Sequence, residues 1–428
     1  MTQTSPGPIR TTVVAALGGV LEYFDFVLFA LLAQPLGDAF FPKEASSDTR
    51  VIEAFGVFAA GYLARPFGGL FFSHRADRQG RKGVFAQTVS LMALTAGLIA
   101  ILPGYATLGV VAPALLILLR VVQGLAFGGE LPGAMCFLAE QVPAAHRCLA
   151  LGILIAAVNA GNLVAYGVIG AVGTFMTPEA FHDWGWRIPF AIGALAGLFS
   201  ILVRKHMSET SVFMKMQAER RIEKVPARTL MRDHWRTVLH MLALVSVHAG
   251  VVSLFFLALP TLLPKFTGLS PTEARGVATW ITIIGTPCYV LGGFVADRLG
   301  RRVAILGTLV LTAIAAPASF ILIGQGHVLP GAILGVVPPC LFVGSYLASM
   351  VDAFPANVRT SGIGLAYNIG YAVVGGGIPT LSAIMLHEGL SPWMVSGTLG
   401  LLAVIAFMVE VLWPRTAGRI QEDGHLRA

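Results

Sequence analysis

Ionisable side chains are rare inside the long apolar segments of this chain, so the few that occur there are the first candidates for chemistry. Glu22 and Asp25 lie three residues apart in one segment and would share one face of a helix. Arg120 lies in another segment, and a rise of about 1.5 Å per residue places all three at a similar depth. Burying a charge is costly unless the charge is paired or hydrated. The three residues therefore predict a buried polar cluster that binds a proton, a carboxylate or both.

Two interpretations of this cluster stay open. Arg120 could bind the carboxylate of a ligand, because its planar guanidinium forms two parallel hydrogen bonds and stays charged. It could also form a permanent structural salt bridge with Glu22 or Asp25. We expect at least one of these two carboxylates to take part directly.

Further polar residues lie at a similar depth in other apolar segments. His248 could titrate near neutrality, or it could be a hydrogen-bonded packing residue. The neutral residues could bind a ligand or join helices to one another. The candidate substrate- and proton-binding residues are Glu22, Asp25, Arg120, Gln123, Glu130, Asn159, Asn162, His248, Tyr367 and Asn368.

The composition indicates which solvent surrounds these segments. The chain has 428 residues, of which 56% are hydrophobic and 12% are charged, and its mean hydropathy is +0.77. Soluble globular chains carry about 25% charged residues, so lipid must cover most of this surface. A helix needs about 20 apolar residues to cross the hydrocarbon core, and continuous runs of this length argue against a barrel. Twelve spans are predicted, at 12–33, 51–72, 84–103, 109–135, 149–173, 187–203, 237–259, 273–295, 303–323, 330–351, 360–385 and 391–413.

Two landmarks occur once in each half of the chain, in the same order. The sequence at 77–82 recurs at 297–302, after the second span of each half. The acidic residue, proline and arginine of 140–147 recur in 352–359, after the fourth span. A duplicated unit with an even number of spans gives a parallel repeat, with a binding site between the halves at mid-depth. The predicted fold is all-α and integral to the membrane, with twelve transmembrane helices in two six-helix bundles related by a pseudo-twofold axis.

The domain boundaries and the orientation follow from the same pattern. We expect an N-terminal six-helix bundle at 1–203, a cytoplasmic linker at 204–236, and a C-terminal bundle at 237–428 that ends in a short cytoplasmic tail. Lys and Arg concentrate in three loops on one side of the threaded chain, and basic loops stay in the cytoplasm, so both termini should be cytoplasmic. The net charge of +7 is interpreted as this topology signal, and nucleic acid is not an expected partner.

Several short motifs indicate a family. They are Leu21-Glu22-Tyr23-Phe24-Asp25-Phe26, Ala64-Arg65-Pro66-Phe67-Gly68-Gly69, Trp184-Gly185-Trp186-Arg187-Ile188-Pro189-Phe190, and the repeated loop at 77–82 and 297–302. As a set they resemble the major facilitator superfamily over essentially the whole chain. Within it they resemble the metabolite:proton symporter family, whose members import small organic acids or compatible solutes such as proline and betaine. The chain departs from the family pattern at Ser73, at Arg75 and at Leu131-Pro132-Gly133.

The resemblance implies a secondary transporter that imports a small polar metabolite in symport with protons by alternating access. An organic acid or other carboxylate is the expected substrate because of Arg120, although a zwitterion such as betaine fits equally if Glu22 and Asp25 neutralise that charge. The protein is not expected to be an enzyme, and no cofactor or metal is expected. Its expected partners are the substrate, protons and the lipid bilayer, and we expect a monomer in the bacterial inner membrane.

Two other functions compete with this one. A proton-coupled exporter of a drug or siderophore-like compound is the alternative, but such antiporters usually carry a Gly-Pro motif in the fifth span, and 149–173 contains no proline. A sensor or anchor without transport would need a folded soluble region. The longest polar segment, 204–236, is too short and too basic for one.

The resemblance also implies a gating role for charged residues at the cytoplasmic mouth. In the superfamily such residues form ion pairs that lock one state of the transporter and release when it switches. The alternative is a topology anchor that follows from the positive-inside bias alone. Gating is favoured because two acidic positions, Asp77 and Asp297, recur with the repeat. The candidate gating residues are Arg65, Asp77, Arg78, Arg81, Glu140, Arg147, Asp297, Arg298, Asp352 and Arg359.

Overall fold

The described part of the computed structural model is helical. It covers residues 8–44, 46–204, 209–219, 222–223, 225–378, 381–382 and 391–413, and every regular element within these ranges is a helix. Nine of the described helices are long and apolar enough to cross a membrane, or up to 11 spans if each of two bent pairs counts as one. The remaining predicted span, 360–385, begins with α17 (Arg359–Gly370) and η4 (Tyr371–Gly375) and continues into positions outside the described residues. The predicted all-α membrane fold is confirmed.

Contacts divide the chain into two compact units. The first comprises Met1–Ala134 and Ala157–Glu209, and the second comprises Met135–Ala156 and Thr210–Ala428. Two long helices, α6 (Val111–Gln141) and α7 (Arg147–Thr174), therefore begin in one unit and end in the other. The bundle boundaries that the sequence indicates, at 203 and 237, stay predictions.

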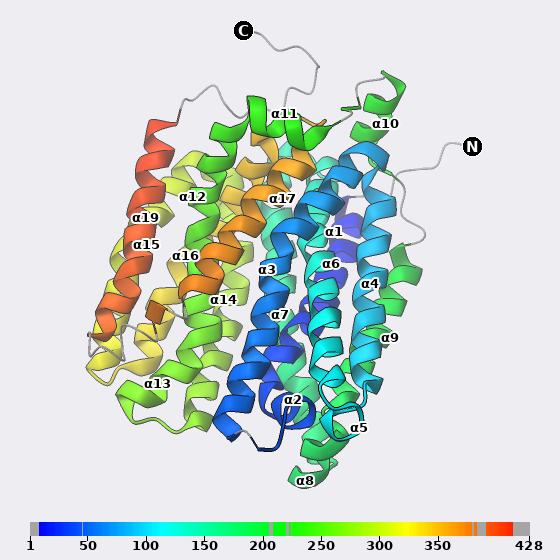
Figure 1. Ribbon diagram of the computed structural model, residues 1–428. Helices are drawn as coiled ribbons and strands as arrows, with labels where there is room; N and C mark the ends of the chain where they lie inside the picture. Colours follow the sequence, from blue (N-terminus) through cyan, green and yellow to red (C-terminus); the bar gives the residue numbers. More distant parts are fainter. Residues whose placement is uncertain are drawn as a thin grey trace. The chain divides into compact units, whose positions relative to one another are not determined.

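The first unit is a bundle of long helices with short connections (Figure 1). The short helices α2, α5 and α8 lie together at one end of this bundle. Its elements, besides its parts of α6 and α7, are α1 (Pro8–Leu31), α2 (Ala33–Phe40), α3 (Ser47–Gln79), α4 (Arg81–Ile101), α5 (Tyr105–Leu108), α8 (Pro178–Ala180), the π-helical turn η2 (Phe181–Gly185) and α9 (Arg187–Arg204).

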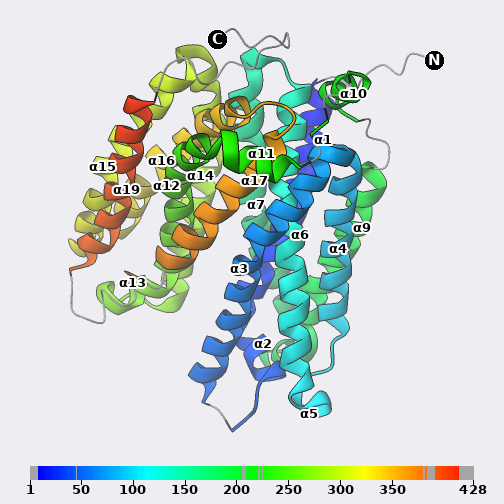
Figure 2. The same cartoon turned by 45° about the horizontal axis from the view of Figure 1, so that its top comes forward.

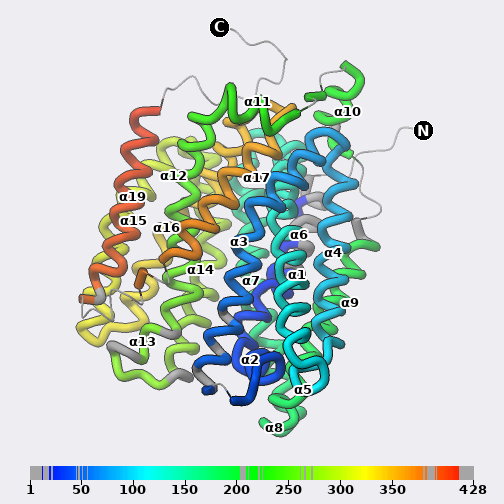
Figure 3. The backbone as a smooth tube through the Cα atoms, viewed as in Figure 1, coloured from blue at the N-terminus to red at the C-terminus, as the bar shows by residue number. Residues whose placement is uncertain are grey.

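The second unit is built in the same way. Within it α15 packs against α16 and α19, and α14 packs against α16, as Figure 2 also shows. The short helices α11 and α13 lie at opposite ends of this unit (Figure 3). Its elements, besides α17 and η4, are η1 (Ala144–His146), α10 (Ser211–Ala218), α11 (Pro226–Asp233), α12 (Trp235–Val251), η3 (Val252–Ala258), α13 (Leu259–Thr267), α14 (Pro271–Leu299), α15 (Arg301–Gly324), α16 (Val328–Ala353) and α19 (Pro392–Leu412).

The repeated loop of the sequence makes the same turn in both units. Gly80 joins α3 to α4 with φ of 101°, and Gly300 joins α14 to α15 with φ of 91°. Positive φ at this residue reverses the chain within one position, and glycine adopts it without the steric cost that a Cβ would add. The Gly of the repeated motif is therefore explained by the tight reversal between two antiparallel helices.

Glycines bring the backbones of α3 and α6 into direct contact. A Cβ added at Gly124 would lie 2.1 Å from the carbonyl oxygen of Gly61, and one added at Gly128 would lie 2.2 Å from that of Arg65. Small residues four apart allow this close approach between membrane helices. Because Arg120 and Gln123 lie on α6 beside this contact, the glycines determine how close α3 comes to those side chains.

We expect Gly124→Ala to destabilise the first unit by about 1–3 kcal/mol, the usual cost of overpacking a tight contact. The matched control is Gly133→Ala on the same helix, where an added Cβ meets nothing within 4 Å. Thermal unfolding of the purified protein in detergent measures both. Equal melting temperatures for the two variants would contradict the backbone contact as a source of stability.

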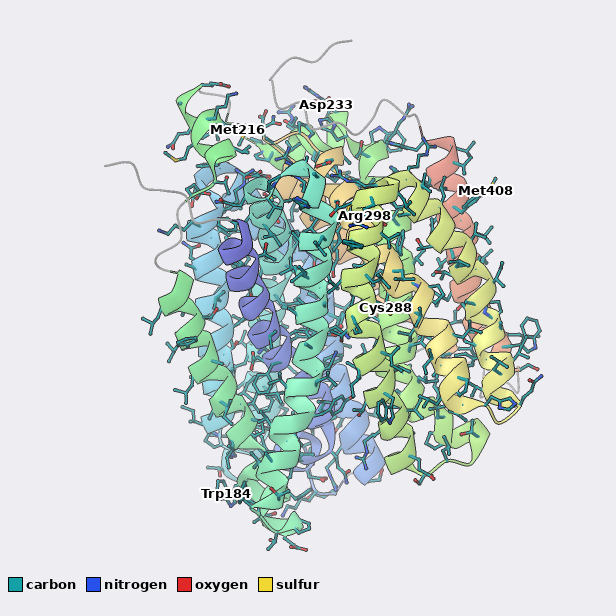
Figure 4. All side chains as sticks on the ribbon, turned by 180° about the vertical axis from the view of Figure 1, so that it is seen from behind. Trp184, Met216, Asp233, Cys288, Arg298 and Met408 are labelled. Carbon is teal, nitrogen blue, oxygen red and sulfur yellow. The ribbon has the colours of Figure 1, made fainter. Side chains whose placement is uncertain are left out.

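The tryptophan motif ties α9 to the end of α4. Trp186 is fully buried, and the Arg187 guanidinium lies over its ring at 4.3 Å. Arg187 Nη1 donates to the carbonyl oxygens of Ala100 at 3.1 Å and Leu102 at 2.8 Å, which satisfies acceptors at the C-terminal end of α4. Trp184, by contrast, is 53% exposed and lies at the end of the unit (Figure 4). This motif therefore has a structural role in the fold.

Candidate substrate and proton sites

A chain of hydrogen bonds joins α1 to α6 in the interior of the first unit. Arg120 Nη1 donates to Gln123 Oε1 at 2.6 Å, and Gln123 Nε2 donates to Asp25 Oδ2. The second arm of the guanidinium, Nη2, donates to the backbone oxygen of Phe26 at 3.1 Å. Asp25 is 4% exposed, and Arg120 and Gln123 are fully buried. The sequence-based prediction that Asp25 and Arg120 share a buried cluster agrees with this geometry.

Aromatic rings surround the Arg120 guanidinium. Its central carbon lies 4.2 Å from the ring centre of Phe26 and 4.9 Å from those of Phe29 and Phe58. Ring faces carry partial negative charge, so these contacts stabilise a buried cation without neutralising it. Nε of Arg120 has no hydrogen-bond partner among the described residues. The guanidinium thus stays charged and retains a donor for an anionic group.

The second carboxylate oxygen of Asp25 faces a small cavity. Asp25 Oδ1 has no hydrogen-bond partner within the described part of the chain, and an added Cβ at Gly193 would lie 2.9 Å from it. The cavity lies beside α1, α4 and α9 and is lined by Asp25, Val89, Met92, Ala93, Gly193, Gly197 and Ser200. Ser200 is the only other polar residue of this lining, so Asp25 is the only ionisable residue that faces this cavity.

Four other predicted members of this site have different surroundings. Glu22 lies on α1, but its side chain is outside the described residues. Glu130 is fully buried on α6, seven residues after Gln123 and thus about 10 Å further along the helix. Asn162 Nδ2 donates to Asn159 Oδ1 at 3.4 Å, so these two amides of α7 contact each other. The described contacts do not link any of the four to Arg120.

His248 lies among tyrosines in the second unit. Its Nδ1 is 2.8 Å from the Tyr346 hydroxyl and 3.2 Å from the Tyr371 hydroxyl, and its ring centre is 6.0 Å from that of Tyr289. The predicted residue Tyr367 stacks on Tyr371 at 4.7 Å. Three tyrosines therefore contact one histidine, and a fourth stacks on one of the three. We name His248 and these four tyrosines the tyrosine cluster.

Irregular helix geometry borders the tyrosine cluster. α12 passes into η3 four residues after His248, and α17 passes into η4 at Tyr371, and both segments have π-helical hydrogen bonding. Such π turns inside longer helices occur frequently at functional sites. Ser253 of η3 is buried, and its hydroxyl has no hydrogen-bond partner among the described residues. Asn368, by contrast, donates to the Gly364 carbonyl of its own helix at 2.8 Å.

Most predicted gating residues of the second unit form two groups of ion pairs. Arg359 Nη1 donates to Glu140 Oε1 at 2.8 Å. Asp352 accepts from Arg147 Nη1 at 3.3 Å and from Arg301 Nη1. We name Glu140, Arg147, Arg301, Asp352 and Arg359 the ion-pair cluster.

Asp297 makes a different contact beside the ion-pair cluster. Its two oxygens accept the backbone N–H groups of Cys148 at 3.0 Å and Leu149 at 2.9 Å, in the first turn of α7. Free N–H groups and the helix dipole favour a carboxylate at this position. Arg298 is not part of the ion-pair cluster, because it is exposed and its guanidinium is 4.1 Å from the Phe294 ring of its own helix.

The equivalent motif of the first unit lies where α3 ends and α4 begins. Asp77 and Arg81 are both buried, with 4.0 Å between Asp77 Oδ1 and Arg81 Nη2. Glu209, which follows α9, accepts the backbone N–H groups of Arg81 at 3.1 Å and Lys82 at 3.0 Å and so caps α4. Arg78 is exposed in the last turn of α3.

Arg65 does not belong with the gating residues by position. It lies twelve residues before Asp77 on α3, which is about 18 Å along the helix. Its guanidinium is 4.7 Å from the Phe127 ring and 5.9 Å from the Phe26 ring, which Arg120 also contacts. The expectation that Arg65 lies at the mouth is therefore corrected, since its aromatic partners lie beside the Arg120 site.

Several residues of these sites were not among the sequence-based candidates. Tyr289, Tyr346 and Ser253 carry no motif that marks them. Arg301 could have been found, because the repeat pairs it with Arg81, which is a predicted gating residue. Glu209 lies in a polar segment, where nothing in the sequence indicates a helix cap.

Two further buried or half-buried ionic clusters lie outside the predicted set. In the second unit His240 Nε2 is 2.7 Å from Glu410 Oε2, and the His240 ring stacks on Trp413 at 4.2 Å. In the first unit Asp38 contacts Arg50 Nε at 2.6 Å and His182 Nε2 at 2.8 Å. The second of these clusters joins α2 to α3 and η2, so it holds the connections at that end of the bundle together.

The comparisons with known proteins agree with this fold and these motifs. The model of the Major Facilitator Superfamily matches residues 15–378, and the chain belongs to this family. It is 32% identical to the proline/betaine transporters of Salmonella typhimurium and Escherichia coli, over 96% of this chain and 85% of each relative. It is 30% identical to the glycine betaine/proline/ectoine/pipecolic acid transporter OusA of Dickeya dadantii, with the same coverage.

Solved structures of the superfamily have the same fold. The proton:xylose symporter XylE superposes with a TM-score of 0.80 at 16% identity, covering 96% of this chain and 97% of that one. The fucose:proton symporter FucP superposes with a TM-score of 0.66 at 14% identity, covering 96% and 100%. The predicted facilitator fold with twelve helices is confirmed, and so is the resemblance to the metabolite:proton symporters. The protein is a multi-pass membrane transporter and not an enzyme.

Proposed function

We propose that this protein is a proton-coupled symporter that imports a small zwitterion of the proline or betaine type by alternating access. The observation that carries the proposal is the buried chain from Asp25 through Gln123 to Arg120, which offers a proton site and a carboxylate site in one set of hydrogen bonds. The relatives at 30–32% identity are named as transporters of proline and betaine compounds, not of organic acids. A zwitterion therefore replaces the organic acid that Arg120 alone suggested.

Asp25 is the proton carrier in this proposal. It is an acidic group buried beside a cation, and its free oxygen faces a cavity. A carboxylate in a membrane interior is a functional residue by default, because an idle charge there is costly. Glu22, three residues earlier on α1, is the competing carrier.

The substrate carboxylate is assigned to Arg120, whose planar guanidinium matches a planar anion. This assignment uses residues of the first unit alone.

The ion-pair cluster and Asp297 are the gating elements in this proposal. They join the turn between α6 and α7 to residues of α14, α15, α16 and α17, so a change of state must break charge-assisted contacts that are mostly buried. We also propose that these residues lie on the cytoplasmic side with both termini, in the inner membrane of a bacterium, and that the protein acts as a monomer.

We expect Glu140→Gln to slow transport at least about tenfold. The change leaves Arg359 as a buried charge without its charged partner, which costs about 3–5 kcal/mol in comparable pairs, and about 1.4 kcal/mol already changes a two-state ratio tenfold. Initial uptake rates at equal amounts of inserted protein measure the effect. The matched control is Glu179→Gln, which changes an exposed glutamate of α8 and should leave the rate unchanged.

The test of the function is uptake into proteoliposomes that contain the purified protein. Labelled betaine, proline, citrate, 2-oxoglutarate and shikimate are supplied with and without an inward proton gradient. Accumulation of betaine or proline that collapses with an uncoupler supports the proposal. Accumulation of an organic acid alone overturns the substrate, and proton-driven movement out of the vesicles favours the exporter.

A further inference from the structure

Asp25 and Arg120 do not contact each other directly. Among the described residues their charged groups form no ion pair within 4.0 Å, and the Gln123 amide lies between them. A salt bridge would couple the two charges by direct attraction. Here the contact passes through a side chain that is neutral and can turn.

The orientation of this amide is determined by its neighbours. An arginine can only donate hydrogen bonds, so Gln123 must present its oxygen to Arg120. Its NH₂ group then points to Asp25, which must accept, and an ionised carboxylate is the strongest acceptor available. The observed arrangement is therefore the one that belongs to a deprotonated Asp25.

Protonation of Asp25 weakens this arrangement at whichever oxygen the proton binds. A proton on Oδ2 sets an O–H against the N–H of Gln123, and the amide must turn to accept it. A proton on Oδ1, which faces the cavity, converts the contact into a neutral hydrogen bond with about half the strength. In both cases the contact that keeps the Gln123 oxygen on Arg120 becomes weaker or is lost.

We propose that Gln123 is the residue that couples proton binding at Asp25 to carboxylate binding at Arg120, and we name this coupling the relay. The Gln123 oxygen and the substrate carboxylate compete for the same N–H donors of the guanidinium, and the charge of Asp25 decides how firmly Gln123 holds its place. Because coupling between two sites is reciprocal, a bound carboxylate that displaces Gln123 must also raise proton binding at Asp25. Gln123 is thus a positioning residue of the transport cycle, and this inference rests on the proposed symport of a zwitterion.

Few other charged groups can affect Asp25. The α4 and α9 residues around its free oxygen are apolar or neutral, and Glu22 of α1 has a side chain outside the described residues. From α3, Tyr62 and Arg65 approach the Arg120 end of the hydrogen bonds that run from Asp25 through Gln123 to Arg120. A pH dependence of substrate binding that disappears when Gln123 alone is changed is therefore a specific sign of the relay.

The test compares Gln123→Met with wild type in detergent solution. Betaine and proline affinities are measured by titration calorimetry across a range of pH, and proton uptake on addition of saturating betaine is followed with a pH indicator in unbuffered solution. We expect the wild-type affinity to rise on acidification by a factor within the range of about 5 to 150 that is typical of coupled sites. Gln123→Met, which has no acceptor for Arg120, should bind with a pH dependence below about twofold and without proton uptake.

Gln123→Glu and Thr88→Val complete the set. The glutamate holds Arg120 with a charged acceptor whatever the state of Asp25, so affinity at neutral pH should fall below that of wild type. Gln123→Met removes the competing acceptor, so its affinity at neutral pH should rise above that of wild type. This opposite expectation keeps the test decisive if one variant does not fold. Thr88 is buried on α4 and donates only to the Phe85 carbonyl, so Thr88→Val should leave affinity, pH dependence and proton uptake as in wild type.

The outcomes separate the relay from the function on which it rests. A wild type that binds neither compound at any pH overturns the zwitterion symport and the relay together. A wild type that binds with proton uptake, while Gln123→Met retains the same pH dependence and the same uptake, overturns the relay alone. The coupling would then be a direct attraction between Asp25 and Arg120.

Discussion

Asp25→Asn is expected to abolish gradient-driven accumulation of substrate while substrate exchange across the membrane continues. An asparagine amide still accepts a hydrogen bond from Gln123, although a weaker one than a carboxylate accepts, but it cannot take up and release a proton. If one proton enters with each zwitterion, a potential of about 100 mV is worth about 2.3 kcal/mol, which supports an accumulation of about 50-fold. The variant should fall to a ratio of about 1, measured as steady-state uptake into proteoliposomes.

Counterflow of labelled substrate against unlabelled substrate is the second readout for this variant. It needs binding and alternation but no net proton movement, so it should persist. The matched control is Asp38→Asn. Asp38 is also an aspartate of the first unit, but it pairs with Arg50 and His182 and takes no part in the hydrogen bonds between Asp25, Gln123 and Arg120. Undiminished accumulation by Asp25→Asn would move the proton to another residue, with Glu22 first.

Arg120→Lys is expected to weaken substrate binding by roughly 10- to 100-fold, because a hydrogen bond to a charged group contributes about 1.5–3 kcal/mol. Lysine keeps the positive charge, but its ammonium cannot donate to Gln123 and to a carboxylate with the fixed fork of a guanidinium. It also loses the flat contact with Phe26 and Phe29. Calorimetric affinity for betaine and proline is the measurement, with the expectation that folding survives.

Arg187→Lys provides the control for the Arg120 variant. Arg187 also lies over an aromatic ring and donates to backbone oxygens, but at the end of α4 and away from Asp25. This variant should lower the melting temperature and leave the affinity unchanged. If both lysine variants bound substrate as tightly as wild type, Arg120 would be a structural cation and the carboxylate site would have to lie elsewhere.

The alternative is that Arg120 has only a structural role and is held permanently by its neighbours. Gln123, the Phe26 carbonyl and three rings already stabilise the guanidinium, and such surroundings are also what a structural arginine needs. The two interpretations differ in the unused Nε donor and in the free Asp25 oxygen. A buried donor or acceptor without a hydrogen-bond partner costs about 1–3 kcal/mol of stability. A purely structural role does not explain why both groups are left without a partner, so these two atoms favour the functional interpretation.

Sequence alone determined the fold, the class of protein and the depth of the central residues. Apolar runs of about 20 residues have one stable form in lipid, because every backbone hydrogen bond must close within the segment. The constant rise of a helix then converts a residue number into a depth, which brought Asp25 and Arg120 to one level before any contact was known. The loop repeated at 77–82 and 297–302 likewise indicated the duplicated unit.

The tertiary structure decided which side chains meet at that depth. Rotation of one helix about its axis and its distance from the next depend on contacts such as Gly61 with Gly124, which lie far apart in the chain. For this reason the sequence could group Gln123 with Asp25 and Arg120 but could not place its amide between them.

The same reason explains the remaining differences. Arg65 was predicted at the cytoplasmic mouth but lies against the aromatic rings beside Arg120. Arg301, and not the predicted Arg298, belongs to the ion-pair cluster. The tyrosines around His248 come from three helices and meet only in the packed unit. Depth is a local property that each helix carries in its own sequence, whereas the partner across the interface is a property of the packing of all of them together.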